Sequence, residues 1–339
     1  MKIIHGPIEI AGQVGITARA QRAVGYASVS AVHSKNRYNY KNDIYIHRKE
    51  EGHISRWFKK GIFLKSYLTD YDVYHFHFAE PFYRYKGYYF DTKLLKKMNK
   101  KLFIEFWGND IRLPKLEKKR NPFYVDPYNL SDEINIEKMK KWADITEGKV
   151  IVADHSFNIF LEKYFDDINI VGQRIEIENF SPSFPNPDNK VPLVVHAPSL
   201  KAFKGTSFLQ KAVENLKKKG LEFEYLEITN KPNEEALQLY SKADIIVDQL
   251  CAGSHGIFAC EAMALGKPVI CYILPELINT YNKGFPIINA NPDTIELILE
   301  EWILKHEERY KLGVKSREYV ERVHDAKIVA NKLIDIYIG

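Results

Sequence analysis

The sequence is poor in the features that mark several large classes of protein. Its 339 residues include three cysteines, Cys251, Cys260 and Cys271, with no Cys-x-x-Cys spacing. Their odd number argues against a disulfide framework. No stretch approaches the ~18 continuous apolar residues of a membrane-spanning helix, and Met1–Gly6 enters a strand-like run without a signal-peptide pattern. We therefore expect a reduced, cytoplasmic protein.

Net charge is also low, although basic residues gather locally. The 49 Lys and Arg residues exceed the 44 Asp and Glu residues by 5. Basic residues concentrate in 93–101 and 115–120. Such stretches are either solvated helix faces or an edge that rests on an anionic membrane or attracts anionic substrates. The second option implies peripheral contact with the inner face of the membrane. Nothing resembles a nucleic-acid-binding module, so we expect no nucleic-acid partner.

What the sequence does contain is a repeated alternation of apolar strands and helices. At 339 residues and 45% hydrophobic content, the chain is too long for one ordinary core and suits two domains of ~150 residues. In the first half, this alternation indicates a parallel, doubly wound sheet. The expected strands are 1–5, 72–78, 101–106 and 150–153, with helices over 17–24 and from a Ser156 cap through Tyr164.

A proline-rich stretch separates this half from a second α/β pattern. Residues 179–190 hold three prolines and little periodicity, which is typical of a linker. We therefore predict a first domain over 1–180 and a second over 181–324. The fold class is then α/β, with two doubly wound Rossmann-like domains whose ligand edges face each other across a cleft. The expected elements of the second domain are strands 193–196, 223–228, 244–248 and 268–273 and a helix over 206–219.

The most informative segment is a glycine-bearing turn followed by a small-residue helix. The turn, Gly253-Ser254-His255-Gly256, follows the apolar strand at 244–248, and the helix after it contains Glu261. Such a turn can aim backbone N–H groups and the positive end of a helix at an anion or a hydroxyl-rich ligand. Glu261, about one turn into the helix, could reach a ribose diol. The alternative is a βαβ unit whose glycines serve only the turn.

A second candidate anion site lies earlier in the same domain. Lys204-Gly205-Thr206 opens a predicted helix, so the Lys side chain and the following N–H groups would suit a diphosphate. The string is not a Walker P-loop, because the spaced glycine before the lysine is missing. The alternative is a plain helix start.

These motifs together resemble the donor-site signature of family 4 retaining glycosyltransferases, or glycosyltransferase group 1, whose members have the two-domain GT-B fold. The resemblance rests on Gly256, Glu261-Ala262-Met263-Ala264, Gly266 and Pro268-Val269. It implies metal-independent transfer of a sugar from a nucleotide-diphosphate donor, with UDP favoured. The basic and aromatic character of the first domain favours a glycan or glycolipid acceptor in cell-surface polysaccharide synthesis. The resemblance also implies that the last helix, about 325–339, packs back on the first domain.

By the same resemblance, Lys204 binds the diphosphate with Gly205 and Thr206, Glu261 binds the ribose hydroxyls, and Ser254, His255 and Gly256 hold the donor sugar. Two positions depart from the family pattern. Gly253 stands where members carry a second Glu, and Ser199, a donor-side position, stands where they carry an Arg. Lys201, Arg19 or Arg112 could supply the missing cation.

The first domain contributes further candidates. His75 and His77 alternate on one strand and face the same side. With no third ligand at suitable spacing, they are interpreted as core or site histidines rather than a metal pair. The resemblance favours His77 as a catalytic residue, with Glu80, Asp110 and Arg112 on the acceptor side and Gly12 and Gly15 beside the donor phosphates or acceptor. For Asp110 the alternative is a tight Asp-stabilised turn.

Two other stretches of the first domain are candidates for a metal site and for an acceptor-binding site. Asp70-Tyr71-Asp72 precedes its strand and is rejected as a metal site, so no metal or cofactor is expected. The aromatic and basic run 81–90 suits a lipid-linked acceptor, or is a packed surface loop.

Two rival functions remain open. The first is a non-catalytic protein that binds nucleotide sugars or glycans on a decayed GT-B scaffold. Ser199 and Gly253 favour it, whereas Lys204 and Glu261 count against it. The second is a nucleotide-sugar epimerase or hydrolase on the same fold.

Overall fold

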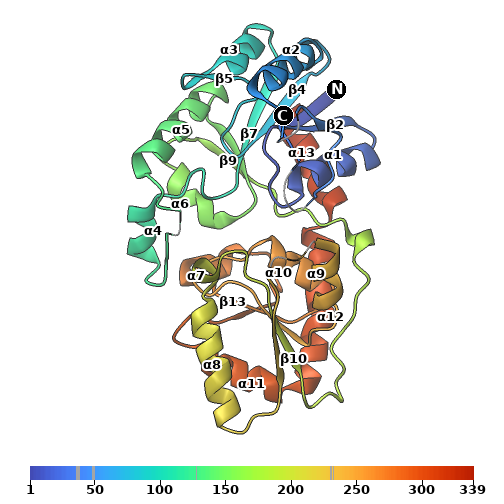
Figure 1. Ribbon diagram of the computed structural model, residues 1–339, viewed down its shortest axis with the longest axis vertical. Coiled ribbons are helices and arrows are strands. Elements are labelled where there is room, and N and C mark those ends of the chain that lie inside the picture. The colour runs from blue at the N-terminus through green and yellow to red at the C-terminus, as the bar shows by residue number, and fades with distance from the viewer. Residues whose placement is uncertain (36–38, 48–49, 127, 230, 232) are drawn as a thin grey trace. The chain divides into compact units, whose positions relative to one another are not determined.

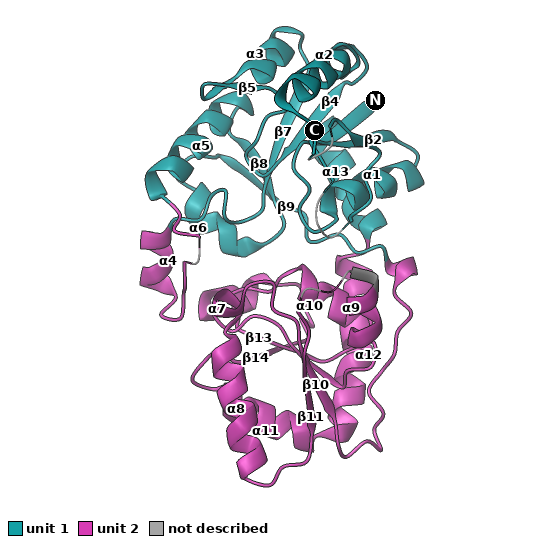
Figure 2. Cartoon of the chain, viewed as in Figure 1, with its two compact units in different colours: residues 1–113, 131–176, 326–339 teal, residues 114–130, 177–325 magenta. Residues whose placement is uncertain are grey.

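The computed structural model describes the whole chain except residues 36–38, 48–49, 127, 230 and 232. The chain forms two compact α/β units, each with its own parallel sheet (Figure 2). Unit 1 comprises residues 1–113, 131–176 and 326–339, and unit 2 comprises residues 114–130 and 177–325. The predicted fold class, two doubly wound Rossmann-like domains, is confirmed.

Unit 1 is built on a seven-stranded parallel sheet (Figure 1). Its strand order is β3-β2-β1-β4-β7-β8-β9, so the winding direction reverses between β1 and β4. Loops at the carboxyl ends of the strands flanking such a reversal diverge and leave room for a ligand. The strands are β1 (Lys2–Gly6), β2 (Ala27–Val32), β3 (Ile44–Tyr45), β4 (Val73–His77), β7 (Lys101–Phe106), β8 (Lys149–Val152) and β9 (Asp167–Ile170).

The core of unit 1 joins the two ends of the chain. Apolar residues of β1, β4, β7 and β8 pack against Val329, Leu333, Ile334 and Tyr337 of the last helix, α13 (Ala326–Ile338). The other helices of the unit are α1 (Gln13–Ala23), α2 (His53–Thr69), α3 (Phe90–Lys97), α5 (Asp132–Ile145) and α6 (Asn158–Leu161), and a small antiparallel hairpin pairs β5 (Arg84–Tyr85) with β6 (Tyr88–Tyr89).

Two predicted helix boundaries in unit 1 are wrong. The first helix begins at Gln13 rather than residue 17, because left-handed Gly12 (φ 84°) already turns the chain into it. The expected Ser156 cap is instead Asp154, whose carboxylate accepts a hydrogen bond from the Ser156 N–H at 2.8 Å. A 3₁₀ turn, His155–Phe157, follows, and α6 ends at Leu161 rather than at Tyr164.

Unit 2 is built on a five-stranded parallel sheet in the order β11-β10-β12-β13-β14, which reverses direction between β10 and β12. Its strands are β10 (Leu193–His196), β11 (Glu224–Glu227), β12 (Ile245–Val247), β13 (Val269–Cys271) and β14 (Ile287–Asn289). The apolar stripe of α8, with Leu209 and Leu216, packs on Val194, Ile245 and Ile270 of the sheet. The helices are α4 (Pro114–Arg120), α7 (Lys201–Lys204), α8 (Thr206–Lys218), α9 (Asn233–Tyr240), α10 (Ile257–Ala264), α11 (Ile295–Leu304) and α12 (His306–Val323).

The expected strands are present to within two residues at each end. Among the described residues, no helix combines the length and the apolar character needed to cross a membrane.

Candidate functional site

The reversal point of the sheet in unit 2 brings the two predicted donor segments together. The strand β10 leads through Ser199, which is exposed, into α7, and β12 leads into the turn before α10. Left-handed Gly205 (φ 73°) joins α7 to α8, and a Cβ there would lie 2.9 Å from Cβ of Leu250, the third residue after β12. Lys204 therefore ends the short helix α7, and Gly205 turns the chain into α8, which begins at Thr206 as predicted.

Lys204 is held by side chains that follow β12. Its Nζ donates to Asp248 Oδ1 at 2.6 Å and to Gln249 Oε1 at 2.9 Å. Asp248 is fully buried, and its Oδ2 has no hydrogen-bond partner among the described residues. A lysine ammonium has three donors, so these two contacts leave one direction for a ligand oxygen. Asp248 and Gln249 were not identified from the sequence, although polar residues directly after a buried strand are a recognisable signal.

The first turn of α8 is tied to the sheet by a buried histidine. His196 donates from Nδ1 to the Val247 carbonyl at 2.8 Å, and its Nε2 accepts from the Thr206 hydroxyl at 2.9 Å. Burial lowers the pKa of His196, so the ring is neutral. The Thr206 side chain thus fixes the start of α8, and a ligand would meet the backbone of Gly205 and Thr206.

The turn before α10 is closely packed. Gln249 donates a side-chain hydrogen bond to the Ser254 carbonyl. Ser254 and His255 are buried, and the His255 ring packs against Tyr281 and Phe285 at 5.2 and 5.3 Å. The side chain of His255 is therefore part of an aromatic cluster, which leaves its backbone for ligand binding.

Gly256 is the N-cap of α10, and the following turns of this helix carry Glu261, which is half-buried. A Cβ at Gly256 would lie 3.6 Å from both Asp248 Oδ2 and Gln249 Oε1. The structure therefore brings Lys204, Gly205 and Gly256 to one edge of the sheet, with the start of α10 beside them.

The cations proposed to replace the missing arginine are all engaged elsewhere. Lys201 pairs with Glu227 at 2.6 Å. Arg19 makes two hydrogen bonds to Glu176, at 2.6 and 3.0 Å. Arg112 is buried and lies 3.3 Å from Asn109 Oδ1.

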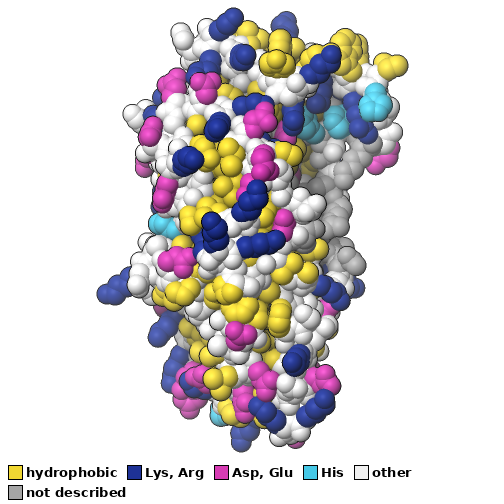
Figure 3. Space-filling model, turned by 90° about the vertical axis from the view of Figure 1, so that its left-hand side faces the viewer, with side chains coloured by type: hydrophobic (Ala, Val, Ile, Leu, Met, Phe, Trp, Pro, Cys, Tyr) yellow, Lys and Arg dark blue, Asp and Glu magenta, His cyan; other side chains and the backbone are white. Residues whose placement is uncertain are grey.

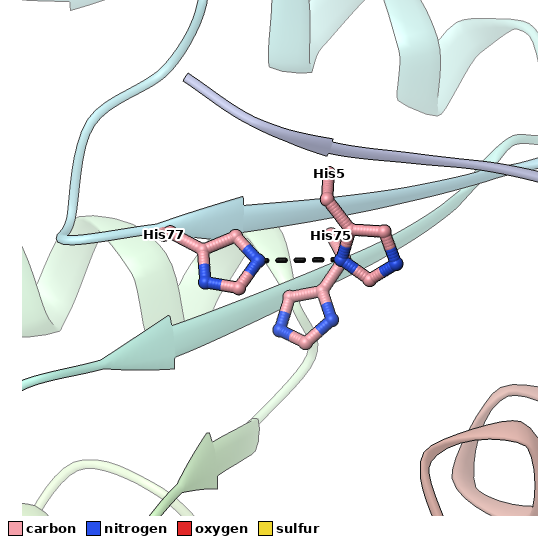
Figure 4. A group of neighbouring side chains, drawn as sticks. All are labelled: His5, His75 and His77. Carbon is pink, nitrogen blue, oxygen red and sulfur yellow. Dashed lines mark hydrogen bonds between the residues drawn. The ribbon is translucent and has the colours of Figure 1, made fainter. Parts of the chain in front are cut away.

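The reversal point in unit 1 gathers three histidines. His5 lies on β1, and His75 and His77 lie on the neighbouring strand β4 (Figure 4). The rings of His75 and His77 stack at 4.4 Å, as their alternation on the strand predicted, and all three residues are buried.

A directional chain of hydrogen bonds crosses this cluster. Trp107 Nε1, which can only donate, lies 3.3 Å from His77 Nδ1. His77 therefore carries its proton on Nε2, which lies 3.3 Å from His5 Nδ1. His5 in turn donates from Nε2 to Gln21 Oε1 at 2.8 Å.

The chain continues through the last helix to His75, which lies beside a buried ion pair. Gln21 Nε2 lies 3.5 Å from the Tyr337 hydroxyl, which donates to His75 Nδ1 at 2.5 Å. His75 Nε2 lies 3.3 Å from Glu105 Oε2, and Arg174 holds both oxygens of Glu105 at 2.5 and 2.9 Å. His5, Glu105, Arg174 and Tyr337 were not identified from the sequence.

Burial makes the three imidazoles neutral. It lowers the pKa of His5 to about 4 and lowers the pKa values of His75 and His77 well below the usual histidine range. One ring nitrogen of each lies within 4.8 Å of the others. The expectation of no third ligand-type residue is therefore wrong, because β1 pairs with β4 and brings in His5. A second such group, His255, Cys260 and His324, lies in unit 2.

The two glycines that follow β1, Gly12 and Gly15, are needed for backbone conformation and close packing. A Cβ at Gly15 would lie 2.1 Å from the Lys41 carbonyl oxygen, and Gly12 takes a left-handed conformation. The carboxylate of Glu9 accepts hydrogen bonds from the Val14 and Gly15 N–H groups, each at 3.3 Å. The start of α1, predicted to meet donor phosphates or acceptor, thus already carries a carboxylate.

The remaining acceptor-side candidates occupy two turns of unit 1. Asp110 accepts from the N–H groups of Trp107 and Gly108, at 3.1 and 2.8 Å, which confirms the Asp-stabilised turn. Burial raises the pKa of Asp110 to about 6. Glu80 pairs with Arg84 at 3.1 Å.

Comparisons with known proteins find one matching family model and several structures of similar fold. The family model described as Glycosyl transferases group 1 matches residues 205–319. The structure of sucrose-phosphate synthase from Thermosynechococcus elongatus is similar, with a TM-score of 0.69 at 15% identity over 100% of this chain and 98% of that chain. HepE from Anabaena, solved with UDP-glucose, gives a TM-score of 0.64 at 11% identity over 99% of both chains.

WaaG, a glycosyltransferase involved in lipopolysaccharide biosynthesis, gives a TM-score of 0.60 at 13% identity over 100% of both chains. These likenesses show that the chain has the GT-B fold. No curated protein sequence matches the chain.

Proposed function

Because residues 205–319 match the model of the glycosyl transferases group 1 family, we propose that the chain transfers a sugar from a nucleotide-diphosphate donor to an acceptor hydroxyl, with retention at the anomeric carbon. One observation carries the proposal. The reversal point of unit 2 has a polar edge formed by Lys204, Gly205, Gly256 and Glu261. The family model matches residues 205–319, so it includes all of these residues except Lys204, which directly precedes it.

The chemistry needs positive charge where the leaving diphosphate develops its own charge. The N-terminus of α10 offers backbone N–H groups and the positive end of the helix dipole. Lys204 adds its remaining donor, and its charge is partly offset by Asp248. We assign the ribose hydroxyls to the Glu261 carboxylate. These groups supply the charge without a metal ion, which supports metal-independent transfer.

We favour UDP as the nucleotide, since the similar HepE is solved with UDP-glucose. We further propose a glycan or glycolipid acceptor in cell-surface polysaccharide synthesis, in line with the role of WaaG in lipopolysaccharide biosynthesis. A lipid-linked acceptor would place the reaction at the cytoplasmic face of a membrane. His77, Glu80, Asp110 and Arg112 stay proposals for the acceptor side.

The test measures nucleotide binding to the wild type, Glu261→Ala and a matched control, Glu214→Ala. Glu214 is exposed on α8 and pairs only with Lys218 among the contacts described. A thermal-shift and calorimetric screen of UDP, GDP and ADP should show binding of UDP to the wild type and the control. Glu261→Ala should bind ~10-fold more weakly, the loss of about one charge-assisted hydrogen bond to a ribose.

Turnover then separates transfer from the rival functions. With a UDP-sugar and a membrane or glycan extract, the proposal predicts release of UDP together with sugar in the acceptor fraction, unchanged by EDTA. Binding of UDP-sugar with no UDP released would favour the non-catalytic protein. A new nucleotide sugar formed without acceptor would favour the epimerase. No binding of any nucleotide would overturn the donor site itself.

A further inference from the structure

The helix α2 exposes four large apolar side chains to solvent. The exposed fractions are 86% for Ile54, 78% for Trp57, 63% for Phe58 and 65% for Ile62. Their spacing of three, one and four residues places them on one stripe of the helix. We call this stripe, with Lys65, the α2 surface.

The α2 surface is not the face by which the helix packs in unit 1. The rings of Phe63 and Tyr67 contact Phe82 at 5.9 and 4.8 Å, and Tyr67 is fully buried. At 100° per residue these two positions lie roughly opposite the exposed stripe. The helix is therefore apolar on two faces, and the fold of the described residues uses only the inner one.

Charge on α2 is of one sign. Between His53 and Thr69 the sequence contains Arg56, Lys59, Lys60 and Lys65 and no Asp or Glu. Lys65 follows Phe58 by seven residues and Ile62 by three, so its ammonium emerges within the apolar stripe. Lysine is depleted at the centre of protein interfaces. At a lipid surface, by contrast, it extends its charge to the phosphates while its stem stays among apolar groups.

A neighbouring element has the same character. The Tyr83 hydroxyl donates to the Lys60 carbonyl at 2.6 Å, which ties the β5–β6 hairpin to α2. Tyr85 and Tyr88 of this hairpin are each 68% exposed, and Lys86 and Lys93 lie over their rings at 5.4 and 5.9 Å. In the upper part of Figure 3, hydrophobic and basic side chains lie side by side on unit 1, with acidic side chains among them.

We propose that α2 is an interfacial helix that binds the surface of an anionic lipid bilayer. Ile54, Trp57, Phe58 and Ile62 would enter the boundary between headgroups and acyl chains, where tryptophan is favoured. Lys65 would meet the lipid phosphates, whose negative charge complements a helix without acidic residues. Lys59 is already paired with Glu51, at 2.5 Å. The inference stands on unit 1 alone and does not depend on the proposed sugar transfer.

The test is flotation with vesicles of phosphatidylcholine alone and with ~30% phosphatidylglycerol. Wild-type protein should float with the anionic vesicles and ~10-fold less with the neutral ones, and added salt should release it. The double variant Trp57→Ala/Phe58→Ala should lose ~10-fold of the binding. The matched control is Leu297→Ala/Leu304→Ala on α11, whose side chains are 68% and 62% exposed, and it should bind as the wild type does.

A second readout reports on Trp57 directly. Its fluorescence should shift to the blue on binding anionic vesicles, and Trp57→Phe should bind without that shift. Equal binding to neutral and anionic vesicles, or equal loss in the α11 control, would overturn the proposal. A third outcome would also overturn the proposal. If Trp57→Ala/Phe58→Ala still binds vesicles but no longer forms a dimer that the wild type forms, the α2 surface binds a second copy of the chain.

Discussion

Gly253 shows how one residue can explain a departure from a family pattern. Its backbone is left-handed (φ 78°), and a Cβ there would lie 2.7 Å from Leu274 Cγ and 3.2 Å from Asn121 Nδ2. Asn121 is itself fixed by donating to the Cys251 carbonyl at 2.9 Å. A glutamate at this position therefore has neither the backbone conformation nor the space it needs.

We accordingly expect Gly253→Ala to destabilise unit 2 by more than the strain of a left-handed alanine, which is ~1–2 kcal/mol. Gly220→Ala isolates that strain, because Gly220 has φ 87° and no described atom within 4 Å of its Cβ position. Denaturant unfolding of the two variants would measure the difference. Equal losses of free energy of unfolding would show that Leu274 and Asn121 can move aside to admit a Cβ. The turn would then have room for a side chain, and packing would not explain why a glycine replaces the glutamate of the family pattern.

At the scale of elements, strand pairing determines what the histidines of unit 1 do. The sequence shows that His75 and His77 share a face of one strand, because side chains alternate along a strand. It does not show that β1 lies beside β4, or that α13 supplies Tyr337, because these neighbours are set by the packing of the whole unit. The strands were predictable from apolar runs, whereas the hydrogen-bond chain through His5 was not.

This buried chain should make unit 1 sensitive to acid. The pKa of His5 is lowered to about 4 by burial, against ~6.5 in the unfolded chain. Between these values the unfolded state binds the proton and the folded state does not, so His5 lowers stability as pH falls from about 6.5 toward 4. Asp91 and Asp110 oppose this trend, because burial raises the pKa of each to about 6 and they are stabilised by protonation.

A difference measurement separates the histidine from those carboxylates. The melting temperature of His5→Asn, compared with that of the wild type, should fall less between pH 6.5 and 4. The control is His53→Asn, since His53 is exposed at the start of α2, and its melting temperature should follow the wild type at each pH. Parallel curves for His5→Asn and the wild type would mean that His5 titrates normally and that the cluster is open to water.

At the scale of the whole molecule, the last helix is the most important element. It belongs to unit 1, although in the sequence it follows all of unit 2, so unit 1 needs the end of the chain to complete its core. Leu333 of α13 is fully buried in the core of unit 1, whereas Ile338 on the same helix is 61% exposed. Leu333→Ala should cost ~2–5 kcal/mol through the cavity it leaves, and Ile338→Ala should stay within ~0.5 kcal/mol of the wild type.

Hydrogen exchange would show where that loss falls. If each unit has its own core, Leu333→Ala should speed exchange in β1, β4 and β7 and leave β10, β12 and β13 protected, because contacts to α13 lie on the first sheet. Ile338→Ala should change neither set. Equal loss of protection in both sheets would mean that the units unfold as one cooperative body. A substitution at one end of the chain would then weaken the donor half-site of unit 2 as well, although no residue of that site contacts Leu333 in the core cluster described.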